Sequence, residues 1–457
     1  MKELYKNRKK DAILFFVCIT VISLCYLLFS VIFRYEDTVS FTAWSVEFWD
    51  CLFSDKGLAG YYAYASENIR GAIHGAPQGS WLTFFPWIIW NFPLFLTHMD
   101  PSSAVIGQLS IVWSKGLLLA CLVVMSVFIY RIVMRLTKGN TIVSLYAVLL
   151  TCGSLELLDS LAYAGQDEII YLTLLVMAVY FTMIGKKGLA LFLAILSVTI
   201  CPLMIVPVFF VFAVYDEKLY VSILKSIACL VPTVLFELCY RNDVIYASLK
   251  DINTVNTFQL MMNTSTFPSA MGPVCTAALI MIILAFWVGF VKFDGDKDRR
   301  IVTILAVVFV SMCFLMGTTF YRSLMYIPFL VMFVCLETQW FSYKTFLLLV
   351  AGGCRFLFFF TNDYNLSTRY LAGGVLKHFA YLPEQVINPI SVGYDCAVYI
   401  FRVLAFAAVI LLFVLHFFGK KITMKNFISE KKMVMIYSLS GLCLVAYFCG
   451  VLLLHLF

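Results

Sequence analysis

The sequence predicts an all-α integral membrane protein, a single polytopic domain over residues 1–457 with about 11–13 transmembrane helices of uneven length. Of its residues 62% are hydrophobic and 13% are charged, whereas soluble proteins carry about a quarter charged residues. Apolar runs of membrane-spanning length recur, and the basic residues of the short connections fall on one side. Soluble, disordered and fibrous classes are excluded. The net charge of +7 is typical of a membrane protein whose cytoplasmic loops are basic, so it does not indicate a nucleic-acid partner.

The first apolar run covers residues 12–33, which are 22 residues without a charge. This length is enough to cross a hydrocarbon core of about 30 Å. A signal peptide has a shorter apolar region of about 7–15 residues that ends at small residues, so a retained helix is predicted. Four bases precede the run, namely Lys6, Arg8, Lys9 and Lys10. They place the N-terminus in the cytoplasm.

Eleven further apolar runs follow. They lie near residues 104–130, 141–160, 169–184, 189–215, 219–240, 275–291, 301–320, 323–338, 345–360, 396–418 and 433–457. Pro202 and Pro207 interrupt the run 189–215, and Lys187 and Lys218 flank it. Because both ends have a cytoplasmic signature, two short helices forming a hairpin are predicted there.

Three long loops are expected on the extracytoplasmic face, at residues 34–103, 241–274 and 361–395. The first holds seven acids against three bases, the reverse of the cytoplasmic turns. Its aromatic residues recur at three- and four-residue steps, which predicts a helix lying along the membrane surface. These residues are Phe41, Trp44, Phe48, Trp49 and Leu52. A Trp- and Pro-rich stretch over 81–93 is typical of an interfacial or re-entrant segment.

Two acids, Glu36 and Asp37, follow the first helix at the outer membrane boundary. Partial desolvation makes a carboxylate there a better proton acceptor, so either is a candidate general base. The alternative is that the two acids only stabilise the N-terminus of the helix that begins near Thr38, since acids are preferred at helix N-termini.

Other polar residues of the outer face are candidates for substrate binding. Glu47 and Asp50 lie one helical turn apart, although charges opposite an aromatic stripe usually form a solvated face. Gln166 and Asp167 occupy a tight outer turn, which also needs Gly and polar residues for ordinary reasons. Trp44 is a candidate for stacking on a sugar ring, and an aromatic belt would equally account for its position.

Three basic residues are candidates for binding a phosphate. Arg322 falls between two apolar runs at the outer surface, where its planar fork of donors suits a lipid phosphate. Arg369 and His378 lie in the last outer loop. The dispersed histidines and the absence of HExxH, CxxC or GxxxxGK[ST] patterns indicate neither a zinc site nor a nucleotide-binding loop.

This layout resembles the polytopic glycosyltransferases of the C type (GT-C fold), which use polyprenyl-phosphate sugars. Asp37 occupies the place of their acidic residue after the first helix. The Gly165-Gln166-Asp167 turn and the stretch from Arg322 to Pro328 are also similar. The resemblance covers most of the chain. It implies a donor of polyprenyl-phosphate sugar, a glycan, lipid or protein acceptor, Asp37 or Glu36 as base, and Arg322 with Arg369 or His378 on the leaving phosphate. Whether a divalent metal assists is left open.

Two rival functions remain at the sequence level. A lipid-linked polysaccharide polymerase or ligase would rely on paired arginines in large late loops, whereas the largest loop here is the first and is acidic. A flippase or secondary transporter would place ionisable groups at the bilayer midplane, for which Lys115, Lys225 and Glu237 are the candidates.

Overall fold

The computed structural model describes residues 2–68, 75–100, 106–216, 218–250, 266–267, 274–290, 296–315, 324–336, 343–362 and 394–418. The chain divides into two compact units, which are considered separately. The first comprises residues 1–34, 126–163 and 326–457, and the second comprises residues 35–125 and 164–325. The long helix α6 (Gln108–Leu136) contributes a part to each unit.

All secondary-structure elements in the described part of the first unit are helical. Besides the end of α6 it contains α1 (Lys2–Ile32), α7 (Thr141–Cys152), α8 (Leu155–Leu158), the π-helical turn η3 (Asp159–Tyr163), α16 (Ile327–Val334), α17 (Tyr343–Asn362) and α19 (Tyr394–Phe418). Helix α1 packs on α7 and η3, α16 packs on α7, and α17 packs along α19. Asn140 begins α7 because its side chain accepts a hydrogen bond from the backbone N–H of Val143.

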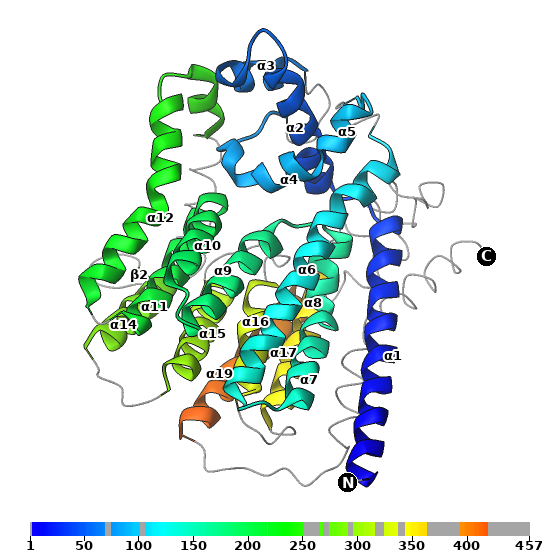
Figure 1. The fold of residues 1–457 in the computed structure, drawn as a ribbon, viewed down its shortest axis with the longest axis vertical. Helices are drawn as coiled ribbons and strands as arrows, with labels where there is room; N and C mark the ends of the chain where they lie inside the picture. Colours follow the sequence, from blue (N-terminus) through cyan, green and yellow to red (C-terminus); the bar gives the residue numbers. More distant parts are fainter. Residues whose placement is uncertain are drawn as a thin grey trace, which may run out of the picture. The chain divides into compact units, whose positions relative to one another are not determined.

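The second unit holds residues 35–103 of the predicted first outer loop and the middle of the chain. Its elements are α2 (Glu36–Leu52), η1 (Leu58–Gly60), α3 (Tyr61–Asn68), η2 (Trp81–Phe84), α4 (Phe85–Trp90), α5 (Phe92–Leu96), the start of α6, α9 (Glu168–Met183), α10 (Lys187–Ile200), η4 (Pro202–Met204), α11 (Ile205–Tyr215), α12 (Leu219–Tyr240), β1 (Thr266–Phe267), β2 (Val274–Cys275), α14 (Thr276–Phe290) and α15 (Lys297–Leu315). The two short strands pair antiparallel. Helices α2–α5 gather together, as the blue ribbons of Figure 1 show.

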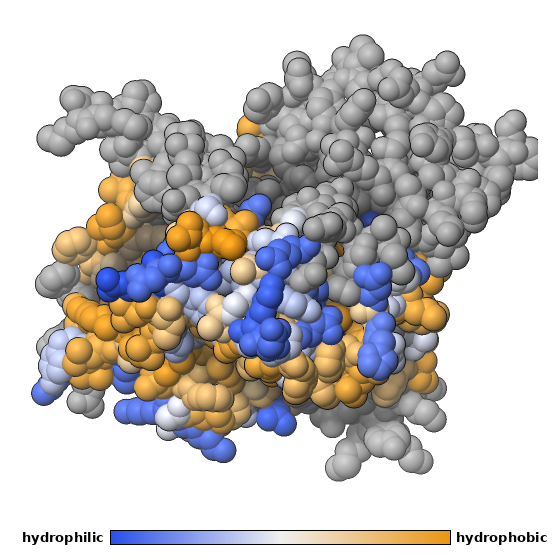
Figure 2. All heavy atoms as spheres, turned by 90° about the horizontal axis from the view of Figure 1, so that it is seen from above, coloured by the Kyte–Doolittle hydropathy of each residue, from blue (hydrophilic) through white to orange (hydrophobic). Residues whose placement is uncertain are grey.

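Three described helices are long and apolar enough to cross a membrane: Ile13–Val31 within α1, α6 and α12. Helix α7 and the helical stretch Leu155–Ala162, bent by 50° relative to each other, would make a fourth span if they cross as one. Shorter apolar helices of 10–17 residues accompany them. Hydrophobic side chains are also common on the described surface, where Figure 2 shows orange residues beside separate hydrophilic patches. The predicted total of about 11–13 spans stays a prediction.

Most of the predicted helices coincide with observed ones. The run 219–240 has the observed bounds of α12, and the run 189–215 is two helices as predicted. The break lies at Cys201, whose extended backbone (φ −133°, ψ 101°) suits a residue that precedes a proline. The run 433–457, much of the predicted outer loop 241–274 and nearly all of the predicted outer loop 361–395 lie outside the described residues.

The segment predicted as the first outer loop begins with the predicted helix, which is α2. The expectation of a solvated face on that helix is wrong for Glu47, which is 1% exposed. It is wrong because α2 is covered on several sides. Helices α3, α4 and α5 all pack against it, and few of its side chains reach the surface.

Candidate active site

The candidate site is built from two helix termini, and the first of these is the start of α2. Tyr35 precedes the helix with an extended backbone (φ −112°, ψ 146°), and its side chain makes no capping hydrogen bond. Glu36 and Asp37 therefore stand in the first turn, where backbone N–H groups lack partners within the helix. The carboxyl group of Asp37 is half-buried. The structure does not describe the side chain of Glu36, so the choice between the two acids stays as the sequence left it.

The second helix terminus is the start of α9, reached through the turn Ala164-Gly165-Gln166. Gly165 has φ +64°, a left-handed conformation that glycine adopts without steric cost. Asp167 then forms the N-cap position of α9, and Glu168 lies buried in its first turn. The tight turn predicted at Gly165 is therefore present.

The two termini meet through hydrogen bonds between residues far apart in the sequence. The side-chain amide of Gln166 donates from Nε2 to Oδ2 of Asp37 at 2.6 Å. Beside it, the hydroxyl of Thr38 donates to the carbonyl oxygen of Ala164 at 3.2 Å. Gln166 is 3% exposed, so its amide is held in place by surrounding protein. The structure thus brings together two of the predicted site residues.

The close approach of the turn to α2 depends on glycine at position 165. A Cβ atom added there would lie 1.9 Å from Oγ1 of Thr38, far inside van der Waals contact. The absence of a side chain therefore allows Thr38 and Gln166 to make their contacts at the same time.

A buried polar network secures α2 against α4 and α6. Thr42 donates to the hydroxyl of Ser114 at 2.8 Å, and Ser114 donates to Oδ1 of Asn91 at 3.0 Å. The amide of Asn91 in turn donates to Ser45 at 2.8 Å. All four side chains are buried. Because an unpaired buried polar group costs about 1–3 kcal/mol, this network favours one orientation of α2.

Chemically, the arrangement suits a carboxylate that must be oriented while still able to accept a proton. An amide donor holds one carboxylate oxygen in position, and it carries no charge and does not titrate. The hydrogen bond is of the strong, charge-assisted kind when Asp37 is ionised. Such a carboxylate is suited to general-base catalysis.

The other predicted substrate-binding residues lie elsewhere on α2 and at the α9 terminus. Trp44 donates from its indole Nε1 to the carbonyl oxygen of Gly75 at 2.7 Å and packs edge-on against Phe41. Asp50 lies near the far end of α2, half-exposed, and its pKa is raised by burial. Asp167 is half-buried beside Gln166.

The three predicted phosphate-binding residues, Arg322, Arg369 and His378, lie outside the described residues. Within the part that the structure describes, no group of three or more His, Cys, Asp or Glu side chains is placed to hold a metal ion.

Sequence reasoning did not single out Thr38, Asn91 or Ser114 as functional. Each is a small polar residue within or beside an apolar segment, a signal too common to identify a partner. The glycine at 165 was the useful indication, because a left-handed turn beside two polar residues brings the backbone close to a neighbour.

A comparison of the chain with models of known protein families and with curated proteins finds no match.

Proposed function

We propose that this chain is a membrane glycosyltransferase that moves a sugar from a polyprenyl-phosphate donor to an acceptor hydroxyl on the extracytoplasmic face. The observation that carries the proposal is the hydrogen bond from Gln166 to Asp37 at the start of the first outer loop. If Asp37 served only to stabilise the N-terminus of α2, it would need no hydrogen-bond partner 129 residues away in the sequence. Helices of membrane-spanning length support the lipid-borne donor.

In the proposed reaction Asp37 accepts the proton of the acceptor hydroxyl as its oxygen bonds to the anomeric carbon. The bond from that carbon to the phosphate oxygen breaks, and the lipid phosphate leaves with the electron pair. A single displacement of this kind inverts the anomeric centre. Arg322, with Arg369 or His378, is proposed to stabilise the negative charge on the leaving phosphate. Gln166 positions the base, and Asp167, Asp50 and Trp44 are proposed to contact the sugars.

The setting of the reaction follows from the distribution of charge. The basic N-terminus is proposed to lie in the cytoplasm of a multi-pass protein of the cell membrane, with the site on the opposite face. The donor reaches this site laterally from the bilayer, and the acceptor is a glycan, lipid or protein. Membrane lipids therefore contact the protein at all times. No nucleic acid is involved.

The transporter alternative finds less support in the second unit. Lys225 forms an ion pair with Asp216 at 2.5 Å, and Glu237 forms one with Lys250 at 2.5 Å. Glu237 also accepts a hydrogen bond from Tyr246 at 2.8 Å. Two of the three ionisable residues expected at the midplane are thus engaged by residues beyond the ends of α12. The third of these residues, Lys115, is fully buried within α6.

The test is a transfer assay with purified protein in nanodiscs, a panel of polyprenyl-phosphate hexoses and pentoses, and Asp37→Asn. We expect the variant to insert and express normally and to lose transfer by about 100-fold or more, the usual contribution of a general base. Asp55→Asn, an exposed acid of the same loop, is the matched control and should retain activity. Full transfer by Asp37→Asn would remove Asp37 from the mechanism. Substrate movement that survives Asp37→Asn and fails in Glu237→Gln would favour the transporter.

A further inference from the structure

One helical stretch of the second unit is apolar but too short to cross a membrane. It runs from Trp81 to Trp90 and consists of η2 followed by α4. Such a stretch is about 15 Å long, half of a hydrocarbon core of about 30 Å. No residue between Trp81 and Leu96 carries a charge. Where this stretch lies relative to a bilayer therefore depends on what its two sides contact.

The two sides of α4 differ in their surroundings. Trp87 and Ile88 are buried, and the ring of Trp87 stacks on Phe41 of α2 with the ring centroids 5.4 Å apart. Phe85 and Ile89 are four residues apart, so they share one side of the helix. They are 41% and 58% exposed. Helix α4 thus has one side covered by protein and one exposed apolar side.

A pair of tryptophans fixes α4 against α6. Trp90 donates from its indole Nε1 to the carbonyl oxygen of Trp113 at 2.8 Å, and Trp113 donates from its Nε1 to the carbonyl oxygen of Trp90 at 3.2 Å. Their rings stack with the centroids 5.5 Å apart. Gly116 permits this approach, since an added Cβ would lie 3.2 Å from the indole of Trp90. The end of α4 therefore lies beside the second turn of α6.

Trp113 marks one boundary of the candidate span α6. About 27 Å of helix separate it from the exposed Arg131, close to the thickness of a hydrocarbon core of about 30 Å. Tryptophan is enriched where lipid meets water, and arginine flanks the apolar core of a span. Because Trp90 lies against Trp113, α4 is level with this boundary.

The exposed side of α4 adjoins an exposed apolar side of α6. Leu109, Trp113, Val124 and Val127 share that side of α6 because their spacing follows the helical repeat, and they are between 39% and 86% exposed. On a helix that crosses a membrane, lipid covers such a side. Since Trp90 stacks on Trp113, the exposed side chains of α4 extend the same apolar surface.

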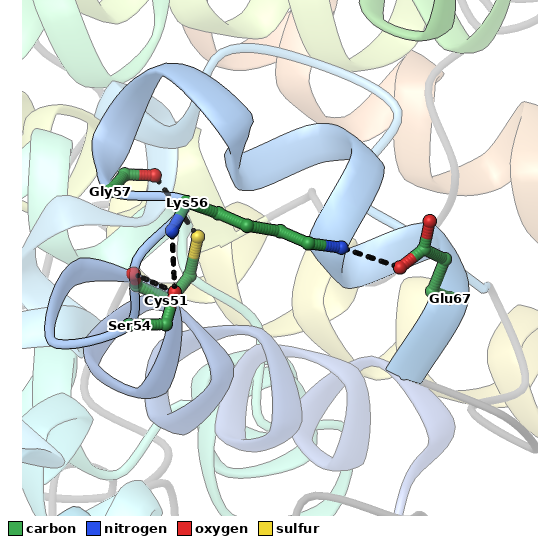
Figure 3. A network of polar contacts seen from close by, with 5 residues as sticks. All are labelled: Cys51, Ser54, Lys56, Gly57 and Glu67. Atoms are coloured by element: carbon green, nitrogen blue, oxygen red, sulfur yellow. Dashed lines mark hydrogen bonds and ion pairs between the residues drawn. The ribbon is translucent and has the colours of Figure 1, made fainter.

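A second surface of helices α2–α5 is polar. Figure 3 shows Nζ of Lys56, in the turn after α2, bonded to Glu67 on α3 at 2.6 Å, and these side chains are 39% and 62% exposed. Cys51 holds the turn, because it donates from Sγ to the carbonyl oxygen of Gly57 at 3.2 Å. Both α3 and α4 pack on α2, and Figure 1 shows α3 farther than α4 from the rest of α6. The surface at α3 suits water, and the surface at α4 does not.

We infer that the helical stretch Trp81–Trp90 lies along the surface of a lipid bilayer, with Phe85 and Ile89 inserted among the acyl chains. Helices of this kind bury their apolar side about 5–10 Å deep, at the boundary between headgroups and acyl chains. The sequence is compatible with an interfacial or a re-entrant segment. The contact between Trp90 and Trp113 favours the interfacial one, since a re-entrant segment would reach the middle of the span.

The inserted stretch fixes the depth of α2. Asn91 follows it directly, donates its amide to Ser45 of α2 at 2.8 Å and accepts a hydrogen bond from Ser114 of α6 at 3.0 Å. Helix α2, whose first turn carries Asp37, is therefore tied to a helix held at the bilayer surface. This consequence for catalysis rests on the proposed function, whereas the lipid contact itself does not.

The experiment is photocrosslinking of the full-length protein in phosphatidylcholine nanodiscs. Phe85→p-benzoylphenylalanine keeps an aromatic ring in α4 and places a benzophenone on its exposed side. Ser66→p-benzoylphenylalanine, at an exposed position of α3, is the control for the polar surface. Val123→p-benzoylphenylalanine is the control for the middle of the span, because Val123 is 65% exposed and about 15 Å along α6 from Trp113. Benzophenone inserts into neighbouring C–H bonds, so contact with an acyl chain adds the mass of one phospholipid.

We expect lipid adducts in similar yield at positions 85 and 123 and at least about tenfold fewer at position 66, since only the apolar surfaces meet acyl chains. Fragmentation of each adduct identifies the carbon that was attacked. At position 85 it should lie in the half of the acyl chain next to the headgroup. At position 123 it should lie in the half next to the terminal methyl group.

Four results would overturn the inference. They are no lipid adduct at position 85 while position 123 reacts, equal yields at positions 66 and 85, attack near the terminal methyl group from position 85, and a crosslink between two copies of the chain in place of lipid. The last would assign this surface to a dimer. With Asp37→Asn added, position 85 should react with lipid as before. Loss of transfer together with retained lipid adducts therefore separates this inference from the proposed function.

Discussion

Nε2 of Gln166 lies 2.6 Å from Oδ2 of Asp37, and this hydrogen bond joins the first turn of α2 to the residues that precede α9. The two residues are 129 positions apart in the sequence. The contact places an acid that follows the first apolar helix beside the turn that precedes α9. It is the feature on which the proposed chemistry depends.

Gln166→Leu should retain the fold and lose transfer activity. The leucine keeps most of the side-chain volume but donates no hydrogen bond, so Asp37 loses its orientation. A hydrogen bond to a charged group contributes about 1.5–3 kcal/mol, which corresponds to a decrease in kcat of roughly 10- to 100-fold. The assay is transfer at saturating donor. Gln166→Asn keeps the amide on a shorter side chain and should recover little activity, whereas unchanged kcat in Gln166→Leu would count against a positioning role.

Gly165→Ala should destabilise the protein. The left-handed backbone at φ +64° costs an alanine about 1–2 kcal/mol, and its Cβ would collide with the hydroxyl of Thr38. We expect a lower thermal midpoint together with weaker transfer, because Gln166 follows directly. Gly185→Ala is the control, since Gly185 has φ +79° but no neighbour within 4 Å of an added Cβ. Equal losses in both variants would show that backbone conformation, and not the contact with Thr38, accounts for the effect.

The burial of Glu47 makes stability depend on pH. Its pKa is raised to about 8 by burial and by Asp50 and Asp100. Between the ordinary value for glutamate and pH 8 the folded protein holds a proton that the unfolded chain has released, so stability falls as pH rises through this window. Glu47→Gln should match the wild type near pH 4.5 and have a higher thermal midpoint at pH 9. A difference between them that does not vary with pH would contradict the assignment.

Tyr240→Phe should loosen the C-terminal end of α12. The Tyr240 hydroxyl donates to the carbonyl oxygen of Leu58 at 2.8 Å and accepts from the indole Nε1 of Trp81 at 3.2 Å. The substitution removes this hydroxyl and leaves the Leu58 carbonyl oxygen and the Trp81 indole N–H without this partner. The loss costs about 1–3 kcal/mol of folding free energy and should lower the thermal midpoint of unfolding. Tyr220→Phe, on the same helix and 57% exposed, should leave the midpoint unchanged.

Arg322→Ala should weaken donor binding. The planar fork of donors of an arginine suits a lipid phosphate, so we expect the apparent KM for the polyprenyl-phosphate donor to rise while the acceptor KM stays the same. Arg322→Lys keeps the charge without the planar fork and should recover part of the affinity. Unchanged donor KM in Arg322→Ala would exclude this role.

Several elements could be predicted from the sequence because their signal is local. Helix α12 has the predicted bounds, α2 begins within two residues of Thr38, and the break before α11 occurs at the proline that predicts it. Hydrophobic length, periodicity and proline act within one segment, so they can be read without knowing what the segment packs against. The burial of Glu47 could not be predicted in this way, because it depends on neighbours supplied by other segments.

The sequence by itself determined the helical class, the apolar segments, the acid after the first apolar helix and the glycine turn, since each follows from neighbouring residues. The tertiary structure alone decided that Gln166 meets Asp37, that Asn91 and Ser114 hold α2 in place, and that Glu47 is buried while Asp50 remains half-exposed. The physical reason is that hydrogen bonds and burial between distant segments depend on how helices pack. Packing is a property of the whole chain, and no single segment encodes it.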